Sequence, residues 1–172
     1  NFPDTVKSLP GGIYSDPGHT WLSLNPDGTA NVGIDAFVQY AVGTMDKLVL
    51  PRAGQKFRRG DDIFILRQGE REATFEAPID GVVEAVNEAA SKSLDMVRRD
   101  PYCQGWLCSV RPDNLAVNLR QMLIAEEAIA WLKTEAKRFQ KFIFSRPAED
   151  TALGIVLQDG GEITSGVLEL MD

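Results

Sequence analysis

The feature that most constrains the fold of this chain is a regular succession of short apolar runs, each closed by a turn rich in Gly, Pro or Asp. Such turns end a strand because glycine accepts a positive φ and proline lacks the N–H that a sheet requires. Many short strands spaced in this way are typical of a small β-barrel or β-sandwich. The strand-like runs cover residues 21–24, 29–34, 46–50, 63–66, 73–77, 81–86 and 105–110.

Two short helices are predicted from a capping residue followed by apolar side chains at helical spacing. Asp35 can N-cap a helix over residues 36–42, because its carboxylate can accept a hydrogen bond from an N–H of the first turn. Asp113 can do the same for a helix that follows the last strand-like run. The apolar side chains of this second helix are Leu115, Leu119 and Leu123.

A longer helix is predicted to follow and to end before Pro147, because the residue before a proline disfavours helical backbone. Its far end is rich in lysine and arginine, which suits the negative C-terminal end of a helix and is interpreted as a solvated face. The basic residues are Lys133, Lys137, Arg138 and Lys141. The apolar positions near period 3.6 are Ile124, Ala128, Trp131, Leu132, Phe139, Phe142 and Ile143.

The chain therefore divides into four parts. Residues 1–18, rich in Pro, Gly and Asp, are interpreted as an irregular arm. Residues 19–112 form the β-domain and residues 113–146 the helices. Residues 147–172 form a tail with a short strand-like run and a turn of helix. Because apolar surface left in water costs about 25 cal/mol per Å², we expect this tail to pack on the domain, on a second copy or on a partner. Its first apolar run contains Leu153, Ile155, Val156 and Leu157.

The net charge of −7, from 25 acidic and 18 basic residues, argues against sequence-independent binding of nucleic acid, which needs a concentrated positive field. No apolar run approaches the roughly 20 residues of a membrane span. We therefore expect a soluble protein of the cytoplasm. The chain begins at Asn1 without a methionine, so an upstream signal or anchor stays open.

The two cysteines predict neither a disulfide nor a metal site. Cys103 and Cys108 are five residues apart, and on a strand this odd spacing places them on opposite faces. Both are predicted to be buried structural thiols. The chain has one histidine, and no cluster of metal-ligating residues is visible. Asp61 and Asp62 are interpreted as turn residues rather than ligands.

No pattern predicts a catalytic centre. His19 is the single histidine and has no nucleophile pattern of Ser or Cys near it, so we interpret it as structural. Trp21, Trp106 and Trp131 are predicted to belong to the core rather than to a platform for a ligand. Without a nucleophile, an acid pair or a metal set, the sequence favours a binding protein over an enzyme.

Six segments, in order along the chain, resemble those of the glycine cleavage system H protein family, a relative of lipoyl and biotinyl domains. The first holds a tyrosine and a His-x-Trp pair, and the last begins a closing helix. The resemblance implies a mainly β, lipoyl-domain-like, flattened barrel sandwich hybrid, with C-terminal helices and a short α/β tail. The segments are 14–21 (YSDPGHTW), 32–35 (VGID), 43–51 (GTMDKLVLP), 77–87 (APIDGVVEAVN), 100–107 (DPYCQGWL) and 123–127 (LIAEE).

The resemblance also implies a swinging cofactor, but the chain lacks the residue that would hold it. In the family a lysine seven residues before the Ala of Ala-Pro carries the lipoyl group, and Glu70 occupies that position here. Lipoylation forms an amide on a primary amine. The carboxylate of Glu70 cannot form that amide, and Arg71 stays protonated and poorly nucleophilic. We therefore predict no bound cofactor. The chain also departs from the family at Cys103, where glycine is usual, and beyond about residue 136.

Three functions are left open. The favoured one is an H-protein-like binding module without lipoylation, acting on a protein partner as a regulator or scaffold, with self-association through the tail as one form of partner. The second is a true lipoyl carrier of the aminomethyl group, and the third is an enzyme. The candidate binding tip has alternating charges that also fit simple surface pairing. It comprises Arg67, Gln68, Gly69, Glu70 and Arg71.

Overall fold

The computed structural model describes residues 9–144, 157–158 and 162–163 of the chain. Its helices are α2 (Ala36–Val42), α3 (Glu88–Lys92), α4 (Leu94–Arg99), α5 (Leu115–Leu119) and α6 (Ala125–Phe144). Its strands are β1 (Ile13–Ser15), β2 (Thr20–Leu24), β3 (Ala30–Ile34), β4 (Lys47–Val49), β5 (Lys56–Phe57), β6 (Asp62–Gln68), β7 (Arg71–Glu76), β8 (Gly81–Val86), β9 (Cys108–Pro112), β10 (Leu123–Ile124), β11 (Leu157–Gln158) and β12 (Glu162–Ile163).

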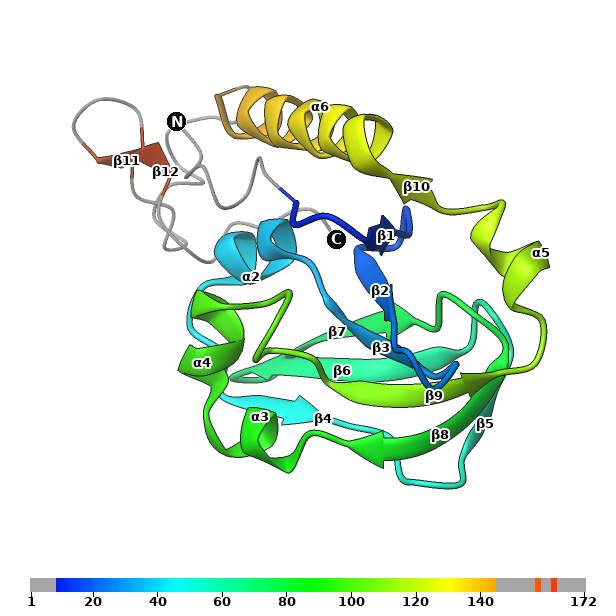
Figure 1. Cartoon of the computed structure of the whole chain (residues 1–172). Helices are drawn as coiled ribbons and strands as arrows, with labels where there is room; N and C mark the ends of the chain where they lie inside the picture. The colour runs from blue at the N-terminus through cyan, green and yellow to red at the C-terminus, as the bar shows by residue number, and fades with distance from the viewer. Residues whose placement is uncertain (1–8, 145–156, 159–161, 164–172) are drawn as a thin grey trace.

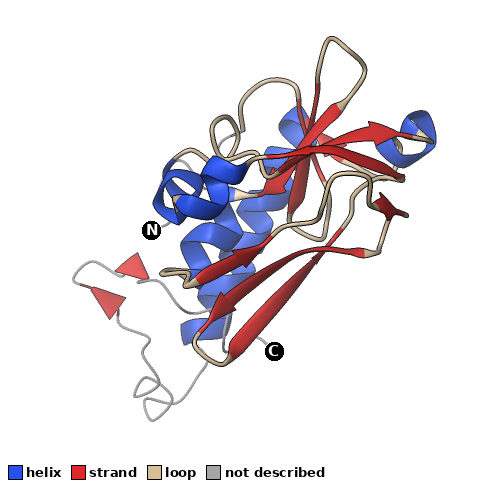
Figure 2. Ribbon diagram, turned by 90° about the horizontal axis from the view of Figure 1, so that it is seen from below, coloured by secondary structure: helices blue, strands red, loops and turns tan. Residues whose placement is uncertain are grey.

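The strands form two antiparallel sheets that share one apolar core. One sheet has the order β10-β1-β2-β3-β9-β8-β5, and the other has the order β4-β6-β7, while β11 and β12 pair only with each other. Side chains from both sheets meet in the core, among them Val32 of β3, Phe64 of β6 and Val110 of β9. Figure 1 shows the layers from one side and Figure 2 shows them from below. The expected mainly β sandwich with C-terminal helices is confirmed.

The β2–β3 hairpin follows from local chemistry at its turn. The carboxylate of Asp27 accepts hydrogen bonds from the backbone N–H and the hydroxyl of Thr29, at 3.0 and 2.6 Å. Gly28 has a φ of 87°, which glycine adopts without strain. The register then places Trp21 opposite Gly33. A Cβ at Gly33 would lie 2.6 Å from the indole of Trp21, so only glycine leaves room for this buried ring.

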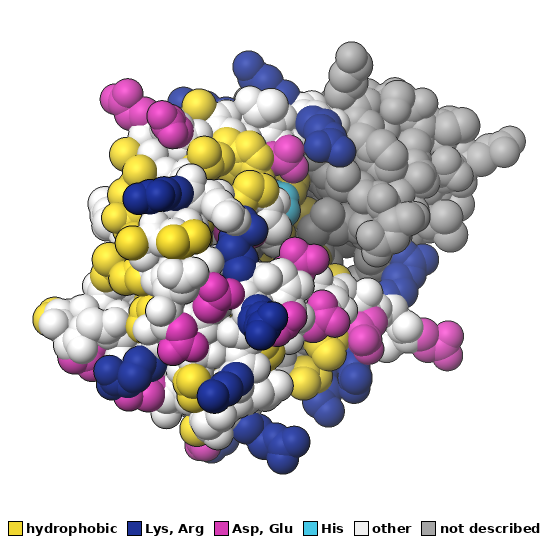
Figure 3. Space-filling view, turned by 90° about the vertical axis from the view of Figure 1, so that its right-hand side faces the viewer, with side chains coloured by type: hydrophobic (Ala, Val, Ile, Leu, Met, Phe, Trp, Pro, Cys, Tyr) yellow, Lys and Arg dark blue, Asp and Glu magenta, His cyan; other side chains and the backbone are white. Residues whose placement is uncertain are grey.

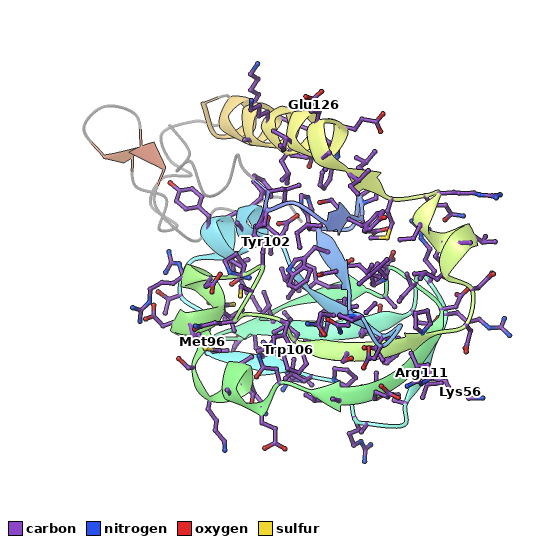
Figure 4. The ribbon with its side chains drawn as sticks, in the orientation of Figure 1. Lys56, Met96, Tyr102, Trp106, Arg111 and Glu126 are labelled. Carbon is purple, nitrogen blue, oxygen red and sulfur yellow. The ribbon has the colours of Figure 1, made fainter. Side chains whose placement is uncertain are left out.

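Helix α2 lies between β3 and β4 and begins where the sequence predicts. Asp35 is its N-cap and accepts a hydrogen bond from the Val38 N–H at 3.0 Å. Gly43 ends the helix with a φ of 79°. Figure 4 labels Tyr102, whose hydroxyl accepts a hydrogen bond from the Ala36 N–H at 3.1 Å. The start of α2 is therefore fixed from two sides.

The structure corrects the sequence reading at the N-terminal arm and at the second helix. The arm contains β1, which pairs with β2 on one side and β10 on the other. The helix predicted to reach Leu123 stops at Leu119, and its N-cap is Asn114 without a side-chain hydrogen bond. Leu123 and Ile124 instead form β10, because pairing with β1 satisfies their backbone. Helices α3 and α4 were not predicted.

Helix α6 packs across β1 and β10, as Figure 1 shows. Its buried face carries Ala128, Leu132 and Ala136, at the spacing that the sequence predicts. Lys133, Lys137 and Arg138 are exposed, as expected of a solvated face. No helix in the described part of the chain is long and apolar enough to cross a membrane.

Two predictions about core residues need correction. Cys108 is buried but Cys103 is exposed, and both thiols are free. The reason is that Cys103 lies in the turn before β9 rather than on that strand, which begins at Cys108. Trp21 is fully buried, whereas Trp106 and Trp131 are half-buried.

Candidate functional site

The candidate binding tip is the turn between β6 and β7. Gln68 pairs with Arg71, so Gly69 and Glu70 form a two-residue turn. Gly69 has a φ of 60° and Glu70 does not have a positive φ, which is the pattern of a type II′ turn. Both residues are exposed. The structure therefore confirms that Glu70 stands at the solvent-facing apex of a hairpin.

The tip is fixed to the body of the protein by the segment that joins α2 to β4. The Gly69 N–H donates a hydrogen bond to Oδ2 of Asp46 at 2.6 Å. The side-chain amide of Gln68 donates to the carbonyl oxygens of Val42 and Thr44, at 3.3 and 2.8 Å. These bonds engage the backbone and the flanking residues, and the side chain of Glu70 takes part in none of them. The position of the apex is thus set independently of the residue that occupies it.

The charges along the hairpin pair across the strands. Nε of Arg67 lies 3.0 Å from the carboxylate of Glu72, and both side chains are exposed. This contact agrees with the surface pairing that the alternating charges predict, and such pairs contribute little to stability. Lys47, on β4, is in register with Arg67 and is exposed. The register of β4 with β6 therefore places a lysine beside this hairpin.

A cleft of about 560 Å³ lies between the hairpin and α2. Four of its lining side chains are buried and apolar, namely Val38, Val42, Leu66 and Phe75. The charged and polar side chains of the lining are half-buried or exposed. Among the residues that the structure describes, the rest of the lining comprises His19, Arg67, Gln68, Arg71, Glu72, Ala73 and Thr74. A concave site with an apolar floor and a polar rim is the usual form of a binding pocket, and this volume lies in the usual range of such pockets.

His19 forms the wall of the cleft opposite the hairpin and joins three elements. Its Nδ1 lies 2.7 Å from Oδ2 of Asp35, and its Nε2 lies 3.5 Å from Oε2 of Glu135 on α6. Its ring stacks on Phe37 and lies tilted against Trp131, with centroid distances of 5.0 and 4.9 Å. The imidazole (cyan) is partly visible in Figure 3, which also shows acidic and basic side chains interspersed over this face. His19 therefore connects α6 to the N-terminus of α2.

The two carboxylates keep His19 protonated. Burial alone would lower its pKa, but the charge and the hydrogen bond of Asp35, with smaller contributions from Glu135, raise the pKa from 6.5 to about 10. In return, the hydrogen bond from His19 lowers the pKa of Glu135. A protonated imidazole with both nitrogens engaged cannot act as a general base near neutral pH. This geometry agrees with the structural role predicted for His19.

The other residues considered from the sequence lie away from this cleft. Asp61 accepts a hydrogen bond from the Arg58 N–H at 2.8 Å and is a turn residue, as predicted. Asp62, also predicted to be a turn residue, is instead the first residue of β6, where it pairs with Glu76. Within the described residues, no group of three or more His, Cys, Asp or Glu could hold a metal ion. Sequence reasoning missed the ion pair of Arg59 with the buried Asp16, at 2.8 Å, and the contact of His19 with Glu135. These partners are distant in sequence, and no local pattern marks them.

Comparison with known proteins gives one answer. The family model for the glycine cleavage H-protein matches residues 13–135. The glycine cleavage system H protein of Psychrobacter sp. (strain PRwf-1) is 32% identical over 122 residues, which cover 71% of this chain and 96% of that protein. A probable glycine cleavage system H protein of Pyrococcus horikoshii is 32% identical over 123 residues, covering 72% of this chain and 91% of that protein.

The structural comparison agrees with the sequence comparisons. A glycine cleavage system H protein from Mycobacterium marinum superposes with a TM-score of 0.62 at 28% identity, covering 69% of this chain and 94% of that one. The match to the family model begins at β1 and ends within α6, so it includes the β6–β7 hairpin, the cleft and His19. These family matches confirm the expectation that the chain is not an enzyme. The chain belongs to the glycine cleavage H-protein family.

Proposed function

We propose that this chain is an H-protein-like module that carries no lipoyl group and acts by binding a protein partner through the hairpin tip and the surface around it. The observation that carries the proposal is Glu70 at the apex of the β6–β7 turn. A lipoyl group is attached through an amide to a primary amine, and a carboxylate offers no amine. The family fold and the fixed position of the tip support a retained recognition surface.

The partner class follows from the family. Proteins that recognise an H protein must read a surface on its barrel, because the attached group alone does not identify its carrier. In this chain that surface would include Arg67, Arg71 and Glu72 beside the apex, all of them exposed. A module of this kind competes with a lipoylated H protein for the enzymes of glycine cleavage. It thereby regulates them without delivering a substrate.

The experiment that tests the absence of lipoylation is the intact mass of the protein isolated from its native host. We expect the unmodified mass. A lipoyl-accepting H protein, isolated from cells with the same lipoylating enzymes, serves as the positive control and must show the adduct. A lipoyl adduct on this chain would overturn the proposal.

The second candidate is a lipoyl carrier, the usual role implied by the family, and one observation favours it. Lys47 is exposed on β4 and is in register with Arg67 of the hairpin. If an adduct is found, peptide mapping distinguishes Lys47 from the other lysines. A Lys47→Arg variant keeps the charge and removes the nucleophilic amine. Loss of the adduct in that variant would place the carrier function at Lys47.

The binding part of the proposal has its own measurement. The purified chain is added to a reconstituted glycine cleavage reaction that contains a lipoylated H protein. We expect inhibition that excess lipoylated H protein relieves. Lys56→Glu is the control, since Figure 4 places Lys56 at the far end of the barrel from α2. Arg67→Glu should weaken the inhibition, and equal inhibition by both variants would contradict a binding surface at the tip.

A further inference from the structure

Strand β7 is the last strand of its sheet, so one of its two backbone edges pairs with no other strand. The sheet order is β4-β6-β7, with β6 on the paired side. Gln68 and Arg71 flank a two-residue turn and form a hydrogen-bonded pair, and such pairs alternate along an antiparallel ladder with pairs that are not hydrogen-bonded. The N–H and C=O groups of Glu72 and Thr74 therefore point away from β6, toward the open edge.

A contact of Glu76 agrees with this pattern. Its carbonyl, two residues beyond Thr74, accepts a hydrogen bond from the hydroxyl of Thr20 at 3.4 Å and so also points outward. The backbone groups of Glu72 and Thr74 hydrogen-bond to none of the described residues. These two residues thus offer their N–H and C=O groups to a further strand.

The cleft beside the hairpin follows this open edge. Residues 71–75 of β7 all contribute to its lining. Consecutive side chains of a strand point to opposite faces of the sheet, so a cavity over one face is lined by alternate residues. A cavity lined by five consecutive residues therefore lies along the backbone edge. Val38 and Val42 also line it, which places the cleft between β7 and α2.

An acidic stripe runs along β7 from the apex of the hairpin. Glu70, Glu72, Thr74 and Glu76 alternate along the chain, and all four are exposed. Glu72 is paired with Arg67. Glu70 and Glu76 form no ion pair with a described residue, and the distance between them corresponds to about 20 Å of extended chain. A strand with two basic residues at this spacing is complementary to the edge in charge.

A second copy of the chain is a poor occupant of this edge. With Thr74 opposite Thr74 of the other copy, Glu72 lies opposite Glu76. With Thr74 opposite Glu72, Glu70 lies opposite Glu76. Both antiparallel registers place carboxylates face to face, which is unfavourable. The packing predicted for the tail, residues 147–172, falls outside the described residues apart from β11 and β12, and stays a prediction.

We propose that the open edge of β7 is a docking site for an extended strand of a partner protein that carries two basic residues six positions apart. The strand pairs with β7 through Glu72 and Thr74, in the antiparallel direction, which is the more stable one. Its basic residues lie at Glu76 and Glu70, and alternate residues between them point toward the apolar side chains of the cleft. This mode of binding rests on the proposed function, since it states how the partner recognises that surface.

A synthetic peptide of the sequence KVTVTVK, with blocked ends, is the probe. Its lysines are six positions apart, and its valines alternate with threonines. Binding to the full-length, isotope-labelled chain is followed by NMR. We expect the amides of Glu72 and Thr74 to shift and to exchange more slowly with solvent. No change at these amides would overturn the proposal, as would changes that grow with the concentration of the chain alone, which would identify a second copy at the edge.

Ester analogues of the peptide test the backbone pairing. With the lysines at Glu76 and Glu70, the threonine N–H groups face β7 and the valine N–H groups face away from it. Replacement of both threonine N–H groups by ester oxygens removes two donors without adding bulk, and should weaken binding by about tenfold. The same replacement at two valines is the matched control and should weaken binding much less. Equal weakening by the two analogues would overturn strand pairing.

Charge variants of the chain test the basic character of the strand. Glu70→Gln combined with Glu76→Gln should weaken binding of the peptide several-fold, and added salt should reduce the difference from the parent chain. The matched control is Glu126→Gln combined with Glu127→Gln. These two glutamates are exposed on the first turn of α6, where Figure 4 labels Glu126. Equal affinity of the two double variants would overturn the proposal of a basic strand.

This proposal and the proposed function can fail separately. A lipoyl adduct on the chain from its native host would overturn the proposed function and would leave the binding of the peptide unchanged. If the chain inhibits the reconstituted reaction but the peptide does not bind, the partner recognises the tip in another way, and strand docking is overturned.

Discussion

The two walls of the cleft are held by opposite kinds of contact. The hairpin tip is positioned by hydrogen bonds to Gly69 and Gln68, and its apex residue, Glu70, contributes to none of them. The opposite wall depends on His19, whose charge is balanced by two carboxylates between two aromatic rings. At the tip a side chain can change while the shape stays. At the His19 wall, each side chain depends on the others.

This difference explains how the fold can keep the shape of the tip whichever residue stands at the apex. An exposed apex residue contributes little to stability, because its side chain is solvated in both the folded and the unfolded chain. A buried ion pair behaves differently, because removal of one member leaves the other charged and without a partner. The following predictions test this contrast, from the His19 wall to the apex.

The largest effect is expected for Asp35→Ala. Asp35 is almost fully buried, caps α2 through the Val38 N–H and contacts Nδ1 of His19. Its removal leaves a helix start without a cap and a buried cation with one partner fewer. We expect the free energy of unfolding to fall by about 3–5 kcal/mol, as measured by urea denaturation.

Asp35→Asn separates the two contributions. Asparagine is also a good N-cap and keeps the hydrogen bond to α2 but not the charge. Its loss should be smaller than that of Asp35→Ala by about 1 kcal/mol, the usual value of a cap. If both variants lose less than about 1 kcal/mol, the buried charges do not hold this wall together.

The second prediction concerns the pH dependence of stability. The pKa of His19 is raised from 6.5 to about 10 on folding, so the folded state binds the proton more tightly. The resulting stabilisation is complete below about pH 6.5 and is lost as the pH rises through about 10. We expect the free energy of unfolding to decrease over this window by an amount on the order of a few kcal/mol.

The matched control for this titration is His19→Gln, which should remove most of the slope. Burial raises the pKa of Cys108 from 9.0 to about 12. This thiol therefore contributes to the slope only above about pH 9. The interval from pH 6.5 to 9 reports on His19. Equal slopes for the two proteins in that interval would show that the imidazole is not the group responsible.

Much of the fold could be predicted because its signals are local. The Asp27-Gly28 turn, the Asp35 cap and the strand-like runs each depend on neighbouring residues, and the structure confirms them. Helices α3 and α4 have five and six residues, which is too short for a helical period to show in the sequence. Strand β10 has two residues and exists through its pairing with Tyr14 and Ser15 of β1.

The candidate site divides in the same way. The strand-and-turn pattern predicted an exposed hairpin tip at residues 67–71, and the family resemblance, which implies a count back from the Ala77-Pro78 pair, singled out Glu70 within it. The His19 wall could be predicted only in part. The sequence predicts Asp35 as a helix cap but not its contact with His19. It also does not predict the contact of His19 with Glu135, which α6 brings from a remote part of the chain. Contacts of this kind require the tertiary structure.

The third prediction tests whether the tip keeps its shape through Gly69. The φ of Gly69 is 60°, and a Cβ there would meet no atom within 4 Å. Gly69→Ala therefore adds backbone strain without a steric clash. We expect it to lower the free energy of unfolding by about 1 kcal/mol, as measured by thermal denaturation. The control is Gly11→Ala, where a Cβ also meets nothing and φ is not positive. A similar loss in both variants would mean that the turn has no special requirement for glycine.

The smallest effect on stability is expected for Glu70→Lys. This variant also tests directly whether the residue at the apex decides lipoylation. The apex is exposed and its side chain supports no contact of the tip, so the free energy of unfolding should change by less than about 0.5 kcal/mol. The variant places a primary amine at the position that the sequence resemblance predicts for the lipoyl lysine of the family. On co-expression with a lipoylating enzyme we expect partial lipoylation, measured by intact mass.

Glu72→Lys is the control for the position of the amine, since it adds a lysine to the same hairpin two residues from the apex. It should stay unmodified, as should the parent chain. Modification of Glu70→Lys alone would show that the recognition surface survives and that the residue at the apex decides whether the module is a carrier. If Glu70→Lys folds normally and gains no lipoyl group, the surrounding surface has changed as well. Gly69 and Arg71, which flank the amine, would then be the first residues to restore. The tip would in that case share only its backbone conformation with the tip of a lipoyl carrier. The contacts that hold the tip would then preserve its shape, but not a surface that the lipoylating enzyme recognises.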